Sequence, residues 1–150
     1  MNLNIRRAQR ADLDDLAVLF DAYRQFYAQP SDVPAAHRFL EARMANSESV
    51  VFLGERDGDP AGFVQLYPLF SSVGMRRVWL LNDLFVAATA RRSGLATKLL
   101  QSAHEMARAD GASGVLLETH TGNRDAQALY EKLGYQRNKA TWFYWLALGD

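Results

Sequence analysis

The segment from Arg91 to Thr97 combines two arginines with a glycine turn, and these residue types together can bind an anionic phosphate. The segment follows an apolar, strand-like run and opens an amphipathic helix, so the first helical N–H groups have no partner within the helix. The helix dipole and the guanidinium groups of Arg91 and Arg92 add attraction for an anion. Gly94 has no side chain and Ala96 a small one, which lets a ligand approach the backbone. The sequence therefore predicts a phosphate site made by Arg91, Arg92, Ser93, Gly94, Leu95, Ala96 and Thr97.

A second motif lies one helix and one strand further along the chain, between residues 123 and 135. It reads Asn-x-x-Ala-x-x-x-Tyr-x-x-x-Gly-Tyr, and we expect Asn123 to cap a short helix that Gly134 ends. In this order and spacing, the two motifs resemble those of the Gcn5-related N-acetyltransferase (GNAT) superfamily. The order of the elements resembles that family over essentially the whole chain.

This resemblance implies that the chain binds acetyl-coenzyme A as its cosubstrate. By resemblance, the backbone of a central strand pairs with the pantetheine arm through Leu84, Phe85 and Val86. The family also places Asn123 and Ala126 beside the thiol end of the cofactor. Tyr130 would be catalytic, because family members often use this tyrosine to donate a proton or hydrogen bond to the departing sulfur. A tyrosine that only packs in the core is the competing interpretation.

The amine acceptor must lose a proton, and Asp83 is the candidate that the sequence offers to receive it. An acid in an apolar strand is costly to bury unpaired, so Asp83 is either functional or held in a structural ion pair. Glu118 and His120 are alternative residues for relaying this proton through water. The run from Asn82 to Val86 resembles that of the diamine and thialysine acetyltransferase branch, which includes a yeast histone and D-amino-acid acetyltransferase. Asn82 stands where members of that branch have a glutamate.

We expect direct transfer of an acetyl group to a primary amine of a small molecule, such as an amino acid or a polyamine-like compound. Its binding residues would be Tyr27, Gln65 and Asp83. Two alternatives stay open, which are acetylation of proteins or peptides and a non-catalytic acyl-CoA-binding module on the same fold.

The composition excludes several other classes of function. Seventeen basic residues balance seventeen acidic ones, so we expect no nucleic-acid partner. There is no cysteine, and three histidines form no pattern of metal ligands, so we expect no metal. No apolar run approaches the length of a membrane span, and we expect a cytoplasmic protein without a membrane partner. The aromatic run at residues 142–145 either completes the core or forms a homodimer surface.

Hydrophobic periodicity and turn residues predict a single α/β domain over residues 1–150, with the GNAT fold. The expected sheet is mixed and mostly antiparallel, with six to seven strands, splayed central strands and about four flanking helices. Strands are predicted at 3–8, 49–56, 62–72, 77–87 and 114–121, with one or two more in 135–148. Helices are predicted from residues 12, 32, 92 and 123 onward. An Asp57-Gly58 turn should join the second and third strands, and Pro68 should mark a bulge or kink.

Overall fold

The computed structural model describes residues 1–149, in two units that comprise residues 1–118 and residues 119–149. The first unit holds the sheet and three helices. Its elements are β1 (Leu3–Arg7), α1 (Leu13–Phe26), α2 (Val33–Ala45), β2 (Val50–Arg56), β3 (Asp59–Ser71), β4 (Arg76–Val86), α3 (Leu95–Ala109) and β5 (Val115–Leu116). The second unit holds α4 (Arg124–Lys132). The expectation that residues 1–150 form one domain stays a prediction.

The sheet has five strands in the order β1-β2-β3-β4-β5. The first four are antiparallel to their neighbours, and β5 runs parallel to β4. The mixed, mostly antiparallel α/β sheet is therefore confirmed, whereas the expected six to seven strands are wrong for the described residues. β2 and β3 are joined by Asp57-Gly58, and both residues have a positive φ, which is the geometry of the predicted two-residue hairpin turn.

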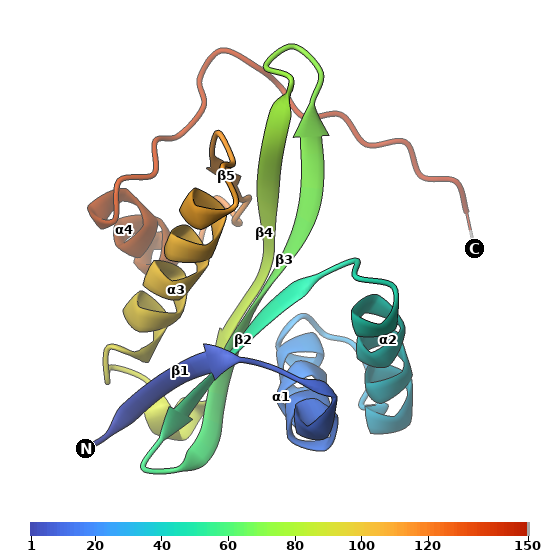
Figure 1. Ribbon diagram of the computed structural model, residues 1–150, viewed down its shortest axis with the longest axis vertical. Coiled ribbons are helices and arrows are strands. Elements are labelled where there is room, and N and C mark those ends of the chain that lie inside the picture. Colours follow the sequence, from blue (N-terminus) through green and yellow to red (C-terminus); the bar gives the residue numbers. More distant parts are fainter. Residues whose placement is uncertain (150) are drawn as a thin grey trace. The chain divides into compact units, whose positions relative to one another are not determined.

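The two faces of this sheet carry different helices (Figure 1). Phe63 packs in a buried cluster with α1 and α2, while its neighbour Gly62 faces Leu95 of α3. A side chain at Gly62 would meet the Phe85 carbonyl oxygen at 2.6 Å and a Leu95 methyl carbon at 3.3 Å, so this site requires glycine. The cluster on the α1 and α2 face comprises Leu13, Leu16, Ala17, Leu19, Phe20, Ala36, Leu40, Val51, Leu53 and Phe63.

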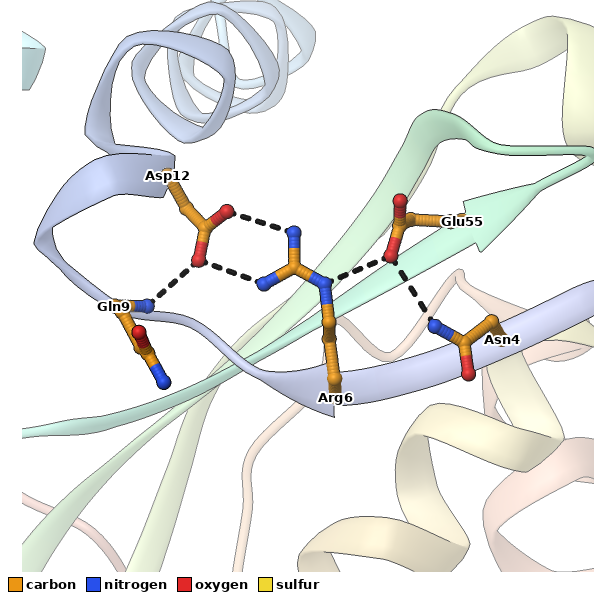
Figure 2. Close-up of polar contacts among 5 residues, drawn as sticks. All are labelled: Asn4, Arg6, Gln9, Asp12 and Glu55. Carbon is orange, nitrogen blue, oxygen red and sulfur yellow. Dashed lines mark hydrogen bonds and ion pairs between the residues drawn. The ribbon is translucent and has the colours of Figure 1, made fainter.

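An ion-pair network ties β1 to the start of α1 and to β2 (Figure 2). Arg6 donates two parallel hydrogen bonds to the Asp12 carboxylate, at 2.8 and 2.7 Å, and its Nε donates to Glu55 at 2.9 Å. The backbone N–H of Gln9 also donates to Asp12, at 2.7 Å. Asp12 precedes α1 and has the residue type of a helix cap, but its side chain accepts no hydrogen bond from that helix because Arg6 and Gln9 occupy both oxygens. Hydrogen bonds from Arg6 are the main reason why the pKa of Asp12 is lowered.

Replacing Asp12 with asparagine should lower the free energy of unfolding by about 1–2 kcal/mol at neutral pH, because charge-assisted hydrogen bonds are lost. The contribution of a carboxyl group with a lowered pKa is present above its unfolded pKa, about 3.9. It is lost as the pH falls through the lower folded pKa. Thermal unfolding at several pH values measures both effects. Asp14→Asn is the control, since Asp14 is exposed and its replacement should change stability by about 0.5 kcal/mol or less. Equal losses for the two variants would contradict this role of Asp12.

In the second unit, α4 begins and ends as its sequence predicts. The Asn123 side chain accepts a hydrogen bond from the Ala126 N–H at 3.2 Å. Gly134 has a φ of 103°, and its N–H donates to the Glu131 carbonyl, while the Tyr135 N–H donates to the Tyr130 carbonyl. These two hydrogen bonds form the Schellman motif that glycine allows after a helix.

Two segments that we predicted as strands form little or no sheet. The strand expected at 114–121 is limited to Val115 and Leu116, and residues 135–148 contain no strand. Both segments have strand-like sequences, but a strand requires a neighbour for its backbone hydrogen bonds. Within residues 1–149, neither segment has one beyond the two β5 residues that pair with β4.

Candidate active site

The turn before α3 has the backbone geometry that an anion site requires. Gly94 has a φ of 87° and Arg92 a φ of 60°, so both adopt the left-handed conformation. The first hydrogen bond of α3 joins the Lys98 N–H to the Gly94 carbonyl, so the N–H groups of residues 95–97 precede the helix's own bonding. The Ser93 hydroxyl donates to the Ala90 carbonyl at 2.6 Å and fixes the turn. Successive N–H groups in such a turn form a concave site for a phosphate.

The end of β4 presents a free edge next to this turn. β3 occupies one side of β4 as far as Val86, but β5 pairs only with Trp79 and Leu80 on the other side. From Leu81 onward, this second edge of β4 has no strand beside it within residues 1–118. Leu84, Phe85 and Val86 lie on this open edge. The expected splaying of the central strands stays a prediction. The Arg91 Nε donates to the Val86 carbonyl at 3.2 Å, which fixes the turn to the end of β4.

Replacing Gly94 with valine should raise the dissociation constant for acetyl-CoA about tenfold or more, because a β-branched residue resists a φ of 87° and distorts the turn. Titration calorimetry measures the affinity. Gly58→Val is a matched control, since Gly58 has the same φ and equally open surroundings in the distant β2–β3 hairpin. Unchanged acetyl-CoA affinity in Gly94→Val would exclude the turn from the phosphate site.

A bulge in β4 positions the candidate base. Gln65 lies opposite Asp83, but the next residue, Leu66, lies opposite Leu81, so Asn82 is an extra residue in the ladder. We expected the irregularity at Pro68, but Pro68 pairs regularly with Trp79. The bulge lies where two successive polar residues, Asn82 and Asp83, interrupt an apolar strand. That break in alternation is the sequence signal that we missed.

Asp83 and Gln65 are both buried, with 4% and 0% of their surface exposed. Gln65 Nε2 donates to the Asp83 carboxyl at 2.8 Å, and Asn82 Nδ2 donates to it at 3.1 Å. Burial raises the pKa of Asp83, and hydrogen bonds from Gln65, Tyr23 and Asn82 oppose that rise. Gln65 Oε1 is buried and accepts no hydrogen bond in the described structure. A raised pKa suits a proton acceptor, and the free Oε1 suits an N–H donor.

Aromatic rings surround this pair on the α1 and α2 face. The Tyr23 ring lies 5.7 Å from Phe63, 6.1 Å from Phe85 and 5.1 Å from Tyr27, centre to centre. Tyr27 ends α1 and is 42% exposed, so it lies where the buried cluster meets solvent. Tyr67 comes two residues after Gln65 and lies on the same face of β3 as Gln65. Burial and the charge of Asp83 raise the pKa of Tyr67 to about 12. The predicted residues Tyr27, Gln65 and Asp83 therefore share one side of the first unit.

The remaining predicted site residues belong to α4. Asn123 is the N-cap, Ala126 supplies the N–H that it accepts, and Tyr130 lies in the last turns of the helix. The Tyr130 ring packs against Tyr135 with centres 5.7 Å apart. Burial, and then the neighbouring Tyr130, raise the pKa of Tyr135. The roles of Asn123, Ala126 and Tyr130 toward the cofactor stay predictions.

A hollow of about 600 Å³ is lined by Arg7, Ser49, Trp79, Met106 and others, and none of the predicted site residues lines it.

Among residues 1–149, no three His, Asp or Glu side chains are grouped so as to hold a metal ion. In the same residues, no helix is both long enough and apolar enough to cross a membrane.

The glycine turn at a helix start and the open strand edge fit the binding of a coenzyme A thioester. Residues 14–135 match the model of the acetyltransferase (GNAT) family, and the chain belongs to this family. It is an acetyl-CoA-dependent N-acetyltransferase.

Relatives support this assignment over nearly the whole chain. The uncharacterised N-acetyltransferase YhfO of Bacillus subtilis is 46% identical over 136 residues, which is 91% of each chain. A crystal structure of a probable acetyltransferase is 41% identical, covers 98% of this chain and 99% of its own, and has a TM-score of 0.93. An aminoglycoside N(6′)-acetyltransferase of Serratia marcescens is 28% identical over 80% of this chain and 86% of its own.

Proposed function

We propose that the enzyme transfers the acetyl group of acetyl-CoA directly to the primary amine of a small molecule. The observation that carries the proposal is the buried pair of Asp83 and Gln65, whose oxygens face an aromatic cluster and can accept protons or N–H bonds. A cationic amine complements a carboxylate and is also attracted by aromatic faces.

Each residue has a part in the proposed reaction. Asp83 receives a proton from the acceptor's ammonium group, which leaves the nitrogen lone pair free to attack. The N–H groups of residues 95–97 hold the diphosphate, and the edge of β4 at residues 84–86 orients the pantetheine arm. Acetyl-CoA supplies an activated thioester when bound. As the new C–N bond forms and the C–S bond breaks, the Tyr130 hydroxyl donates its proton toward sulfur.

The acceptor class rests on this chemistry and on the relatives. The Serratia relative is named for acetylating a small-molecule amine, and the run from Asn82 to Val86 resembles the diamine and thialysine branch. Because Asn82 removes one carboxylate relative to that branch, we expect amines with a single positive charge near the reacting nitrogen to be better substrates than polyamines.

Release of free thiol from acetyl-CoA, followed with a panel of acceptors, tests the proposal. The panel should contain monoamines, amino acids, diamines, aminoglycosides and N-terminal peptides at equal concentration. The proposal predicts the highest kcat/KM among the free small amines. A preference for peptides or folded proteins would contradict it and would identify a protein acetyltransferase.

A further inference from the structure

The hollow of about 600 Å³ lies where α3 ends, and all the residues that line it belong to the first unit. Met106, Ala109 and Asp110 line it from the end of α3, while Val50 and Trp79 line it from β2 and β4. α3 is roughly 20 Å long, and the turn from Arg91 to Thr97 lies at its other end. The hollow is therefore separate from the proposed phosphate site.

The hollow has the size and the apolar lining of a small-molecule site. Its volume lies within the range of about 300–1,000 Å³ that is typical of such pockets. The buried residues Val50 and Trp79 contribute apolar surface, and Pro68 lies beside Trp79 in the sheet. Met44 and Met106 also line the hollow, and methionine side chains adapt their shape and contact aromatic rings favourably. This lining favours a ligand with an aromatic body.

Two arginines that line the hollow have no acidic partner in the first unit. Within residues 1–118, neither Arg7 nor Arg10 forms an ion pair. Arg6, by contrast, binds the carboxylates of Asp12 and Glu55 (Figure 2). A guanidinium group binds a carboxylate through two parallel hydrogen bonds. Arg7 and Arg10 therefore favour a ligand with an anionic carboxylate.

The one acidic residue that lines the hollow does not cancel this positive charge. The Asp110 carboxylate accepts a hydrogen bond from Trp79 Nε1 at 3.0 Å and lies 3.8 Å from Nε of Arg77, which also lines the hollow. Arg77 thus balances Asp110. The carbonyl end of a helix repels an anion, but the carbonyl groups of residues 106–108 already accept backbone hydrogen bonds. The net charge around the hollow remains positive.

A buried hydroxyl group gives independent evidence for a ligand. Ser49 lines the hollow, and its Oγ is buried without a hydrogen-bond partner in the described structure. A buried polar atom without a partner costs about 1–3 kcal/mol. Gln65 Oε1 is the other such side-chain atom among the described residues, and it belongs to the proposed acceptor site. A carboxylate oxygen in the hollow would accept the Ser49 hydrogen bond.

We propose that this hollow is a second binding site, which takes a small aromatic carboxylate. The carboxylate binds Arg7 and Arg10 and accepts a hydrogen bond from the Ser49 hydroxyl. The aromatic ring lies against Trp79 and Met106. The acceptor site proposed above has a buried carboxylate and suits a cation, whereas this site suits an anion. The inference therefore does not rest on the proposed acceptor.

Titration calorimetry of the full chain with 3-phenylpropionate and indole-3-acetate tests the proposal, with the neutral amides of the two acids as matched compounds. We expect at least one acid to bind saturably, and its amide to bind about tenfold or more weakly, because the amide lacks the charge. Saturating acetyl-CoA should leave the dissociation constant of the acid within about threefold, because the sites are separate. Binding of neither acid, equal affinity for acid and amide, or competition by acetyl-CoA would overturn the proposal.

Replacing Arg7 and Arg10 together with glutamine should weaken binding of the acid about tenfold or more. The matched control is the double variant Arg24→Gln with Arg38→Gln, which removes the same charge from α1 and α2. Neither Arg24 nor Arg38 lines the hollow. The control should bind the acid with the affinity of the wild type. Unchanged affinity in the first variant, or an equal loss in the control, would exclude the two arginines from the site.

Ser49→Ala separates a contact with the ligand from a role in folding. The melting temperature of the free protein should stay the same or rise, because the hydroxyl forms no hydrogen bond that the substitution could remove. Affinity for the acid should fall about fivefold, the effect of one hydrogen bond. A lower melting temperature or unchanged affinity would contradict the assignment of this hydroxyl to the ligand.

Discussion

Replacing Tyr130 with phenylalanine should lower kcat by about 100-fold and leave the dissociation constant of acetyl-CoA within about threefold of the wild-type value. Loss of a positioned proton donor typically costs 10²- to 10⁴-fold in rate. Phenylalanine keeps the ring that packs against Tyr135, so the helix α4 should be preserved. Steady-state kinetics, together with calorimetric titration of acetyl-CoA, separate the two effects.

The pattern of loss distinguishes proton donation from packing. If the hydroxyl serves only to hold α4, the melting temperature should fall and kcat should change little. Tyr135→Phe is the matched control, because it removes a hydroxyl from the other ring of the same contact. We expect its kcat to stay within about threefold of wild type. Equal losses of kcat in both variants would assign Tyr130 a structural role.

Replacing Asp83 with asparagine should lower kcat/KM by about 100-fold near neutral pH while raising the melting temperature. The activity falls because asparagine cannot accept the ammonium proton. Stability rises because burial raises the folded pKa of Asp83. A carboxyl group whose pKa is higher in the folded than in the unfolded protein lowers the free energy of unfolding. This loss begins as the pH rises above the unfolded pKa, about 3.9, and is complete above the folded pKa. The asparagine side chain carries no charge, so the variant avoids this loss of stability. Each kcal/mol gained in the free energy of unfolding raises Tm by about 2–4 °C in a chain of this length.

Asp21→Asn is the control, and its change in stability should be opposite to that of Asp83→Asn. Asp21 is 3% exposed and accepts hydrogen bonds from the Asp32 N–H, the Ser31 hydroxyl and Gln25. These bonds, the Asp32 N–H first, lower the pKa of Asp21, so its replacement should reduce stability at neutral pH and leave kcat/KM nearly unchanged. Lower stability in Asp83→Asn would show that its carboxylate is structural, and retained activity would exclude it as the base.

The elements that the sequence predicted well are those whose signals are local. Asn123 and Gly134 determine the ends of α4 through single side-chain and backbone hydrogen bonds. The Asp57-Gly58 turn requires two positive φ values, which these residues adopt at low cost. Gly94 marks the turn before α3 for the same reason. The splayed strands were expected only from the family resemblance.

The features that were missed depend on neighbours distant in sequence. Asp12 has the residue type of a helix cap, but Arg6 and Gln9 compete for its oxygens. The bulge at Asn82 arises from the pairing of β3 with β4, which periodicity in one strand does not determine. The strands expected at 114–121 and 135–148 have the right composition, yet strand formation depends on pairing with a neighbouring strand, which composition does not determine.

The central claim is that the turn from Arg91 to Thr97 holds the diphosphate of acetyl-CoA. Titration calorimetry of the wild-type enzyme with acetyl-CoA and with acetylpantetheine, which lacks the nucleotide and diphosphate, tests it most directly. We predict saturable binding of acetyl-CoA and about tenfold or more weaker binding of acetylpantetheine. No binding of acetyl-CoA, or equal affinity for the two compounds, would contradict the claim.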